Sequence, residues 1–352
     1  MILTPSSSPH IRNNPSITSI MLWVTAALIP GLITLIYFYG WGYLINSLIA
    51  IFTALGSESV ILRLRHRNIY KTLTDGSAML TGLFIGISMP GFAPWWVIVI
   101  ATVFAIVFIK HLYGGLGQNL FNPAMGAFAL VLISFPVPMT TSWVAPMGPN
   151  GIERLSLYEH VQISIRGTHS DFDGVTMATP LDHYKTNIQN KTADELLETN
   201  EFSNGPLYGI IWVNLAFLFG GLLLLAKKMI TWHAPTGLLL GVGVMSLLFS
   251  SDPDIRMPIS LHMMGGATML GAFFIATDPA STATSNKGKI IFGLGVGVLT
   301  YIIRTWGNFP DAIAFSVLIM NFAAPFIDYY TRPRVYGKSG SMKGYSLRGG
   351  NK

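Results

Sequence analysis

Long apolar runs separated by short polar segments dominate the chain. A membrane-spanning helix needs roughly 20 mostly apolar residues. Segments that meet or approach this requirement lie at 20–40, 43–62, 75–90, 93–112, 122–138, 208–226, 234–250, 259–277, 290–305 and 311–330. The third, fifth and ninth of them are short or are interrupted by glycine and proline. The pattern predicts an all-α polytopic membrane protein with about ten transmembrane helices.

Composition supports this prediction and narrows the chemistry. Hydrophobic residues make up 51% of the chain and charged residues 11%, whereas an ordinary soluble domain carries roughly 25% charged residues. The chain contains no cysteine, which excludes disulfides, thiolate metal sites and cysteine-bound iron–sulfur clusters. Any redox chemistry is therefore expected to rest on an organic cofactor or on another subunit.

The basic residues predict the orientation in a bacterial inner membrane. With a cytoplasmic N-terminus, most of the 22 lysines and arginines fall on the cytoplasmic side, as the positive-inside rule requires. This larger group is Arg12, Arg63, Arg65, Arg67, Lys71, Lys110, Lys227, Lys228, Lys287, Lys289, Arg332, Arg334, Lys338, Lys343, Arg348 and Lys352; the smaller one is Arg154, Arg166, Lys185, Lys191, Arg256 and Arg304. Both termini are thus predicted to be cytoplasmic. The net charge of +6 is attributed to lipid and topology, with no nucleic-acid partner.

Two related halves flank a long polar loop. The run Gly76-Ser77-Ala78-Met79-Leu80 resembles Gly266-Ala267-Thr268-Met269-Leu270, and Phe121-Asn122-Pro123-Ala124 resembles Phe309-Pro310-Asp311-Ala312. Because five is odd, two halves of five spans each would form inverted repeats. The predicted parts are a cytoplasmic segment 1–19, membrane halves 20–139 and 207–330, a periplasmic loop 140–206 and a basic cytoplasmic tail 331–352.

The most informative part of the loop is Asp173-Gly174-Val175-Thr176-Met177-Ala178-Thr179-Pro180-Leu181. By composition it is a turn followed by small residues and threonines ahead of a proline. A threonine that accepts a phosphate-linked group must be exposed and flanked by small residues, and Gly174 and Ala178 meet that steric need. Asp173 would bind the Mg²⁺ of a modifying enzyme or activate the hydroxyl.

The same segment resembles the flavinylation motif, Asp-x-x-Ser/Thr-small-Ala-Thr, in which a flavin transferase joins FMN to the last threonine through a phosphodiester. The resemblance assigns the attachment to Thr179, with Asp173, Thr176 and Ala178 as the other motif residues. Met177 stands where glycine or serine is commoner. After the motif, His183, Tyr184 and Lys185 either touch the flavin or belong to a solvated loop, and the loop is favoured.

Longer runs extend the resemblance over nearly the whole chain. They are Leu112–Asn119, Phe121–Met125, Gly266–Phe274, Thr277–Pro279 and Ile327–Gly337. They resemble the family of membrane proteins that includes RnfD, of the Rnf (Rsx) ion-translocating electron-transport complex, and NqrB, of the sodium-translocating NADH:quinone reductase. The short N-terminal segment favours the Rnf branch.

The resemblance implies a urea-transporter-like fold of two inverted five-helix repeats. It implies a subunit of an oxidoreductase that couples electron flow between ferredoxin and NAD to H⁺ or Na⁺ movement. Covalent FMN would be its cofactor, either alone or together with a second, non-covalent flavin. The cofactor, rather than the side chains, would supply the redox chemistry. Its partners would be the A, B, C, E and G components of the Rnf complex, the flavin transferase and membrane lipid. We identify no catalytic side chain and no metal site.

Three acids are candidates for an ion pathway, because ionisable groups in membrane spans are costly. Glu58, inside a span, is either an ion ligand or the partner of Arg63 or Lys110. Asp75 and Asp278 lie at the same ends of spans three and eight, and their alternatives are a helix cap and a turn before Pro279. Competing functions for the whole chain are a urea-transporter-like channel and a scaffold with an unused flavin site.

Overall fold

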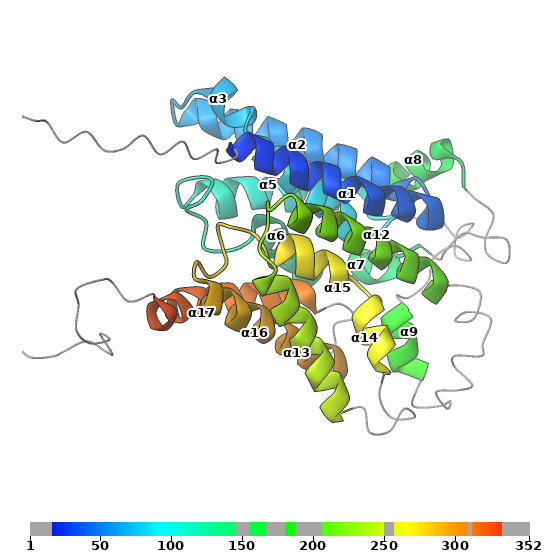
Figure 1. The fold of residues 1–352 in the computed structure, drawn as a ribbon. Helices are drawn as coiled ribbons and strands as arrows, with labels where there is room; N and C mark the ends of the chain where they lie inside the picture. The colour runs from blue at the N-terminus through cyan, green and yellow to red at the C-terminus, as the bar shows by residue number, and fades with distance from the viewer. Residues whose placement is uncertain are drawn as a thin grey trace, which may run out of the picture.

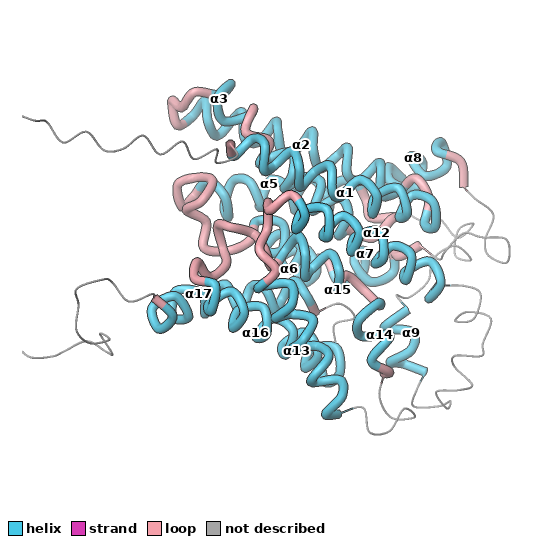
Figure 2. The backbone as a smooth tube through the Cα atoms, viewed as in Figure 1, coloured by secondary structure: helices cyan, strands magenta, loops and turns pink. Residues whose placement is uncertain are grey.

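The computed structural model describes residues 16–144, 155–166, 180–187, 206–249, 257–307 and 312–332. Throughout these ranges the chain forms helices joined by loops, with no β-strand (Figure 2). The prediction of an all-α polytopic protein is confirmed.

The first half of the protein carries the elements before residue 144. They are α1 (Ile17–Tyr39), α2 (Gly42–Leu64), α3 (Ile69–Leu73), α4 (Ser77–Ser88), α5 (Trp95–Phe104), its π-helical continuation η1 (Ala105–His111), α6 (Pro123–Ser134) and α7 (Pro136–Thr141). Two helices follow in the long loop, α8 (Leu157–Arg166) and α9 (Pro180–Asn187).

The second half repeats this plan with different interruptions. Its elements are α12 (Pro206–Ala226), α13 (His233–Phe249), α14 (Ile259–Met264), α15 (Thr268–Leu270), the π-helical η3 (Gly271–Ile275), α16 (Asn286–Trp306) and α17 (Ile313–Thr331). A helix thus occupies every segment that the apolar pattern predicted as a span.

Helix length divides these spans into two classes. Within the described residues, five helices are long and apolar enough to cross a membrane: Ile17–Tyr39, Gly42–Leu64, Gly209–Ala226, Asn286–Trp306 and Ile313–Thr331. By contrast, α4 and α6 have 12 residues each, about 18 Å of helix against a hydrocarbon core of about 30 Å. Spans three and five are short, as predicted.

The prediction for the ninth span was wrong. This span was expected to be short or interrupted by glycine and proline, but α16 is continuous over 21 residues. A Cβ atom on Gly293 would overlap the carbonyl oxygen of Ala234, and one on Gly297 would overlap that of Leu238. These glycines therefore let α16 approach α13 closely, which is how small residues pack membrane helices.

The interruption falls in the eighth span instead. Between α14 and α15 the chain passes through Gly265 and Gly266, and Gly266 has a φ of 56°. Gly76, at the start of α4, has a φ of 78°. Glycine adopts this left-handed conformation at low cost. The two runs that look alike in sequence therefore share a left-handed glycine ahead of a helix.

The halves run in opposite directions. In Figure 1, α1 starts at the end of the bundle where α17 finishes, and successive spans alternate in direction, so that α12 starts at the other end. The equivalent helices α1 and α12 pack together, as do α6 and α17. Contacts between equivalent helices are expected across the axis that relates inverted repeats.

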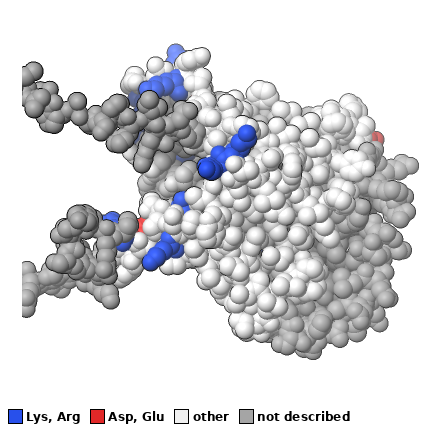
Figure 3. All heavy atoms as spheres, in the orientation of Figure 1, with Lys and Arg blue, Asp and Glu red and all other residues white. Residues whose placement is uncertain are grey.

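The two ends of the bundle differ in charge. Lysines and arginines gather at the end where α1 starts and α17 finishes, here called the basic end (Figure 3). Its described members are Arg63, Arg65, Arg67, Lys71, Lys227, Lys228, Lys287, Lys289 and Arg332. The opposite end, next to α8, α9 and α14, is here called the loop end (Figure 1). Between the ends, exposed apolar side chains such as Phe52, Phe322 and Phe326 (each 71% exposed) suit contact with lipid.

Candidate functional site

The flavin motif ends where α9 begins. Asp173, Thr176, Ala178 and Thr179 lie outside the described residues, so their predicted roles stay predictions. Pro180, which directly follows Thr179, is the first residue of α9. The contacts of α9 are therefore the structural information nearest to the proposed attachment point.

The favoured interpretation of Lys185 as part of a solvated loop was wrong. Lys185 lies in the last turn of α9, and its Nζ donates hydrogen bonds to the carbonyl oxygens of Arg304, at 3.0 Å, and Gly307. Residues 119 and 122 positions away accept these bonds, and a single sequence gives no sign of such a contact.

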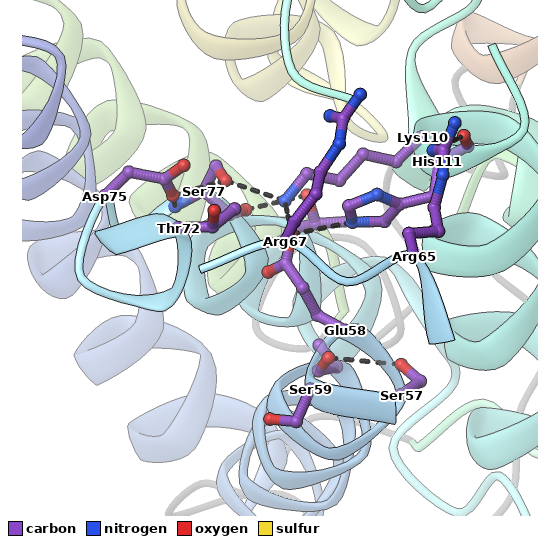
Figure 4. A network of polar contacts seen from close by, with 12 residues as sticks. Ser57, Glu58, Ser59, Arg65, Arg67, Thr72, Asp75, Ser77, Lys110 and His111 are labelled. Carbon is purple, nitrogen blue, oxygen red and sulfur yellow. Dashed lines mark hydrogen bonds and ion pairs between the residues drawn. The ribbon is translucent and has the colours of Figure 1, made fainter. Parts of the chain in front are cut away.

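Glu58 lies in a buried ionic cluster near the basic end (Figure 4). Its Oε1 accepts from Lys110 Nζ at 2.6 Å and lies 2.8 Å from His111 Nε2. All three side chains are buried, with Glu58 0% exposed. Of the alternatives for Glu58, the structure shows the pair with Lys110. A role as an ion ligand stays a prediction.

The π-helical turn η1 carries both partners of Glu58. Lys110 and His111 are consecutive residues, yet both side chains reach the same carboxylate oxygen. Further support for this turn comes from the end of α2, because Arg65 Nη1 donates to the carbonyl oxygen of His111 at 2.6 Å. π-Helical turns are rare and frequently occur at functional sites.

The cluster continues through a hydroxyl to Asp75. Lys110 Nζ donates to Ser77 Oγ at 2.7 Å, and Ser77 Oγ donates to Asp75 Oδ1 at 2.5 Å. The backbone N–H of Ser77 donates to the same oxygen at 2.7 Å. The N-cap of α4 is Gly76 rather than Asp75, but Asp75 accepts the N–H of the first residue of that helix, and its contacts also join it to the cluster.

Burial makes this arrangement demanding. Moving a carboxylate and an ammonium from water into an apolar interior is costly unless each is paired and hydrogen-bonded. Within the described part of the chain, Glu58 Oε2 and His111 Nδ1 have no hydrogen-bond partner. The cluster therefore retains one acceptor atom and one ring nitrogen for a further proton, ion or water.

Beside the cluster, a cavity of about 390 Å³ lies between the two halves. Lys110, Ser77, Asn119 and Asn122 line it from the first half. Residues of the second half that line it include Phe273, Phe274, Thr277, Asp278 and Lys289. Among the described residues, Asn119 Oδ1 is buried without a hydrogen-bond partner. The cavity combines apolar walls with a few polar groups, as binding pockets for small molecules do.

Asp278 reaches this cavity from the turn after η3. Its Oδ2 accepts from Ser281 Oγ at 2.8 Å, and its Oδ1 accepts from the N–H of Ala280 at 3.4 Å. The turn alternative therefore describes its local contacts. Asp278 and the Asp75-bound Ser77 border one cavity, so the two predicted pathway acids belong to the same region. Their role in ion movement stays a prediction.

A second buried cation escaped the sequence analysis. Arg304 is 2% exposed, and its Nη1 donates to the carbonyl oxygen of His262 at 2.9 Å and to Thr268 Oγ1 at 3.0 Å. Its charge alone predicted only that Arg304 lies on the outer side of the membrane. Its position inside the predicted span 290–305 was the missed signal, because a charge within a span is a functional candidate by default.

Arg304 is one of several side chains that donate hydrogen bonds to the backbone carbonyl oxygens at the break in span eight. Thr268 Oγ1 donates to the carbonyl oxygens of His262 and Gly265, each at 2.9 Å. Asn214 Nδ2 donates to those of Met264 and Gly266, at 2.8 and 2.9 Å. Non-helical backbone at membrane depth must be satisfied by such protein groups.

Comparisons with known proteins agree with this architecture. The NQR2, RnfD, RnfE family matches residues 4–337. The D component of an ion-translocating oxidoreductase complex from Marinobacter nauticus is 51% identical, over 99% of this chain and 100% of the relative. Proteins of the same name from Shewanella amazonensis and Shewanella sediminis are 50% and 48% identical, over 96% and 94% of this chain and 99% and 97% of the relatives. The chain is a multi-pass membrane protein that belongs to the NQR2, RnfD, RnfE family.

Proposed function

We propose that this chain acts as the D component of an ion-translocating oxidoreductase complex and carries covalent FMN on Thr179. The observation that carries the proposal is the near-complete match to relatives of that name, in a chain that also contains Asp173-Gly174-Val175-Thr176-Met177-Ala178-Thr179. Electrons would pass through the flavin between ferredoxin- and NAD-linked partners, coupled to H⁺ or Na⁺ movement. A solute channel would have no need for the flavin motif.

The cavity between the halves is our candidate for a second, non-covalent flavin. Its volume of about 390 Å³ lies within the range of small-molecule pockets. Asn119 and Asn122 would hold the polar edge of a flavin ring, and Phe273 and Phe274 would contact its faces. The unpartnered Asn119 Oδ1 supports this fit. When bound, the flavin would supply electron transfer.

The chain's own residues would contribute charge and ion access. Lys110 supplies a positive charge at the cavity wall, held in place by Glu58 and Ser77. Glu58, Asp75 and Asp278 are the proposed acids of the ion pathway. Moving one charge against 100 mV costs about 2.3 kcal/mol, so ion movement must be gated by the redox reaction.

We further propose that the basic end faces the cytoplasm of a bacterium and that the loop 140–206 faces the periplasm. The concentration of basic residues at one end supports this orientation. The other components of the complex and a flavin transferase would be the partners. A reporter enzyme fused near Asn190 should act as periplasmic, and one fused after Lys352 as cytoplasmic. The opposite pair of results would contradict the orientation.

The attachment is tested by producing the full chain together with a flavin transferase. Denatured protein should fluoresce under ultraviolet light on a gel, and mass spectrometry should find the added FMN on the peptide that contains Thr179. Thr179→Val should abolish the fluorescence, whereas Thr176→Val, the matched control, should keep it. Fluorescence lost only in Thr176→Val would refute the assignment, and an unmodified wild-type chain would refute the electron-carrier function.

A further inference from the structure

Helix α9 is attached to the second half at both of its ends. Near its start, Leu181 is 2% exposed, and its Cδ2 would lie 3.2 Å from a Cβ atom on Gly265, at the break in span eight. In its last turn, Lys185 reaches the end of α16. Residues four apart lie on one face of a helix, so Leu181 and Lys185 direct the same face of α9 toward the membrane half.

The acceptors of Lys185 explain why a lysine suits this position. Arg304 and Gly307 stand in the last turn and at the C-cap of α16. The last carbonyl oxygens of a helix lack partners within the helix and carry partial negative charge. An ammonium that donates to two of them makes charge-assisted hydrogen bonds, which are stronger than neutral ones.

The last turn of α16 also forms hydrogen bonds with residues on both sides of the break in span eight. The carbonyl oxygen of Arg304 accepts from Lys185, while its guanidinium donates to His262 and Thr268 on the other side. α9, α16 and the break are therefore joined through one residue of α16. α9 therefore contacts the broken span directly, through Leu181 at Gly265, and is linked to it a second time through Arg304.

We propose that Lys185 is a positioning residue for the covalent flavin. The inference rests on the proposed attachment at Thr179. Thr179 directly precedes α9, and consecutive Cα atoms are about 3.8 Å apart, so an anchored α9 limits the movement of the attachment threonine. Because a cofactor protein must hold the reactive ring against its partner, releasing α9 should loosen the flavin without removing it.

A spin label on α9 tests the anchor without reference to the flavin. The chain has no cysteine, so Thr186→Cys gives a single labelling site on the exposed side of α9. In this background, Lys185→Ala should raise the detached population about tenfold, as loss of charge-assisted hydrogen bonds predicts, and the label should become more mobile. Lys185→Arg should keep the label immobile, and Lys185→Gln should give an intermediate spectrum. Arg166→Ala, which removes an exposed charge from α8, is the matched control.

Time-resolved fluorescence anisotropy of the flavin-bearing full chain completes the test. Lys185→Ala should leave the flavin content measured by intact mass unchanged and should increase the fast, nanosecond depolarisation. Unchanged mobility of both label and flavin in Lys185→Ala, or equal increases in Arg166→Ala, would overturn the inference. A wild-type chain without flavin would refute the proposed attachment, and the spin label would still decide whether Lys185 holds α9.

Discussion

Each half of the protein buries a cation near the end of its fourth span. The two cations make a similar hydrogen bond, to a hydroxyl at the start of a helix, but their other contacts differ. Lys110 donates to Ser77, at the start of α4, and Arg304 donates to Thr268, at the start of α15. Each hydroxyl follows a left-handed glycine, Gly76 or Gly266. An inverted repeat thus places one such centre near the basic end and the other near the loop end.

The difference lies in what else each cation holds. Lys110 meets the carboxylate of Glu58 and lines the cavity between the halves. Arg304 reaches the carbonyl oxygen of His262 across the break in span eight, and its own carbonyl oxygen accepts from α9. The Lys110 centre is therefore a charge pair beside a binding cavity, whereas the Arg304 centre links a broken span to the loop. The comparison predicts that they respond differently to mutation.

The largest effect is expected from Glu58→Gln. This change leaves the ammonium of Lys110 buried without its counterion, and breaking a buried pair in this way typically costs about 3–5 kcal/mol. The unfolding temperature of the full chain in detergent should fall strongly, and the yield of folded protein should fall with it. The unfolding temperatures of the variant and the wild type are compared by thermal unfolding, followed by circular dichroism or by the fluorescence of a dye that binds unfolded protein.

The double variant Glu58→Gln/Lys110→Met provides the control. Removing both charges avoids the unpaired ion, so it should recover most of the stability that the single variant loses. Lys71→Met removes an exposed charge at the basic end and should change the unfolding temperature little. If the single and double variants unfold at the same temperature, the charge pair is not what distinguishes the Lys110 centre.

A smaller loss is expected from Arg304→Met. This change removes the donor together with its charge, so no isolated ion remains, and the carbonyl oxygen of His262 still accepts from Thr268. Loss of hydrogen bonds from a charged group typically costs about 1.5–3 kcal/mol. The same unfolding assay should place Arg304→Met between wild type and Glu58→Gln. Arg332→Met, an exposed charge at the basic end, is its control. A loss larger than that of Glu58→Gln would reverse the comparison.

The sequence revealed the spans better than it revealed these centres. Apolar runs of helix length identify helices because each span must satisfy its own backbone in lipid. Glu58 could be singled out because an acid inside such a run is rare. Its partners could not be chosen, since Lys110 and His111 lie 52 and 53 residues away. The continuity of the ninth span could not be predicted, because a glycine that weakens a helix and one that packs it against a neighbour, as Gly293 and Gly297 do, look alike in sequence. The anchoring role of Lys185 depends on the end of α16, which only the folded chain brings beside α9.

The smallest losses of stability are expected from removing the hydroxyl to which each cation donates, which is the feature that the two centres share. Ser77→Ala and Thr268→Val each remove the hydroxyl that its cation meets, and a hydrogen bond typically contributes about 1 kcal/mol. Ser77 Oγ also donates to Asp75, so its loss leaves both a cation and a carboxylate with one partner fewer. Thr268 Oγ1 donates to two carbonyl oxygens, of which that of His262 keeps its bond from Arg304. Ser77→Ala should therefore lower the unfolding temperature more than Thr268→Val. Equal losses would mean that the two hydroxyls act only as contacts at the start of their helices. A larger loss for Thr268→Val would mean that the break in span eight, rather than the charge pair, limits the stability of the bundle.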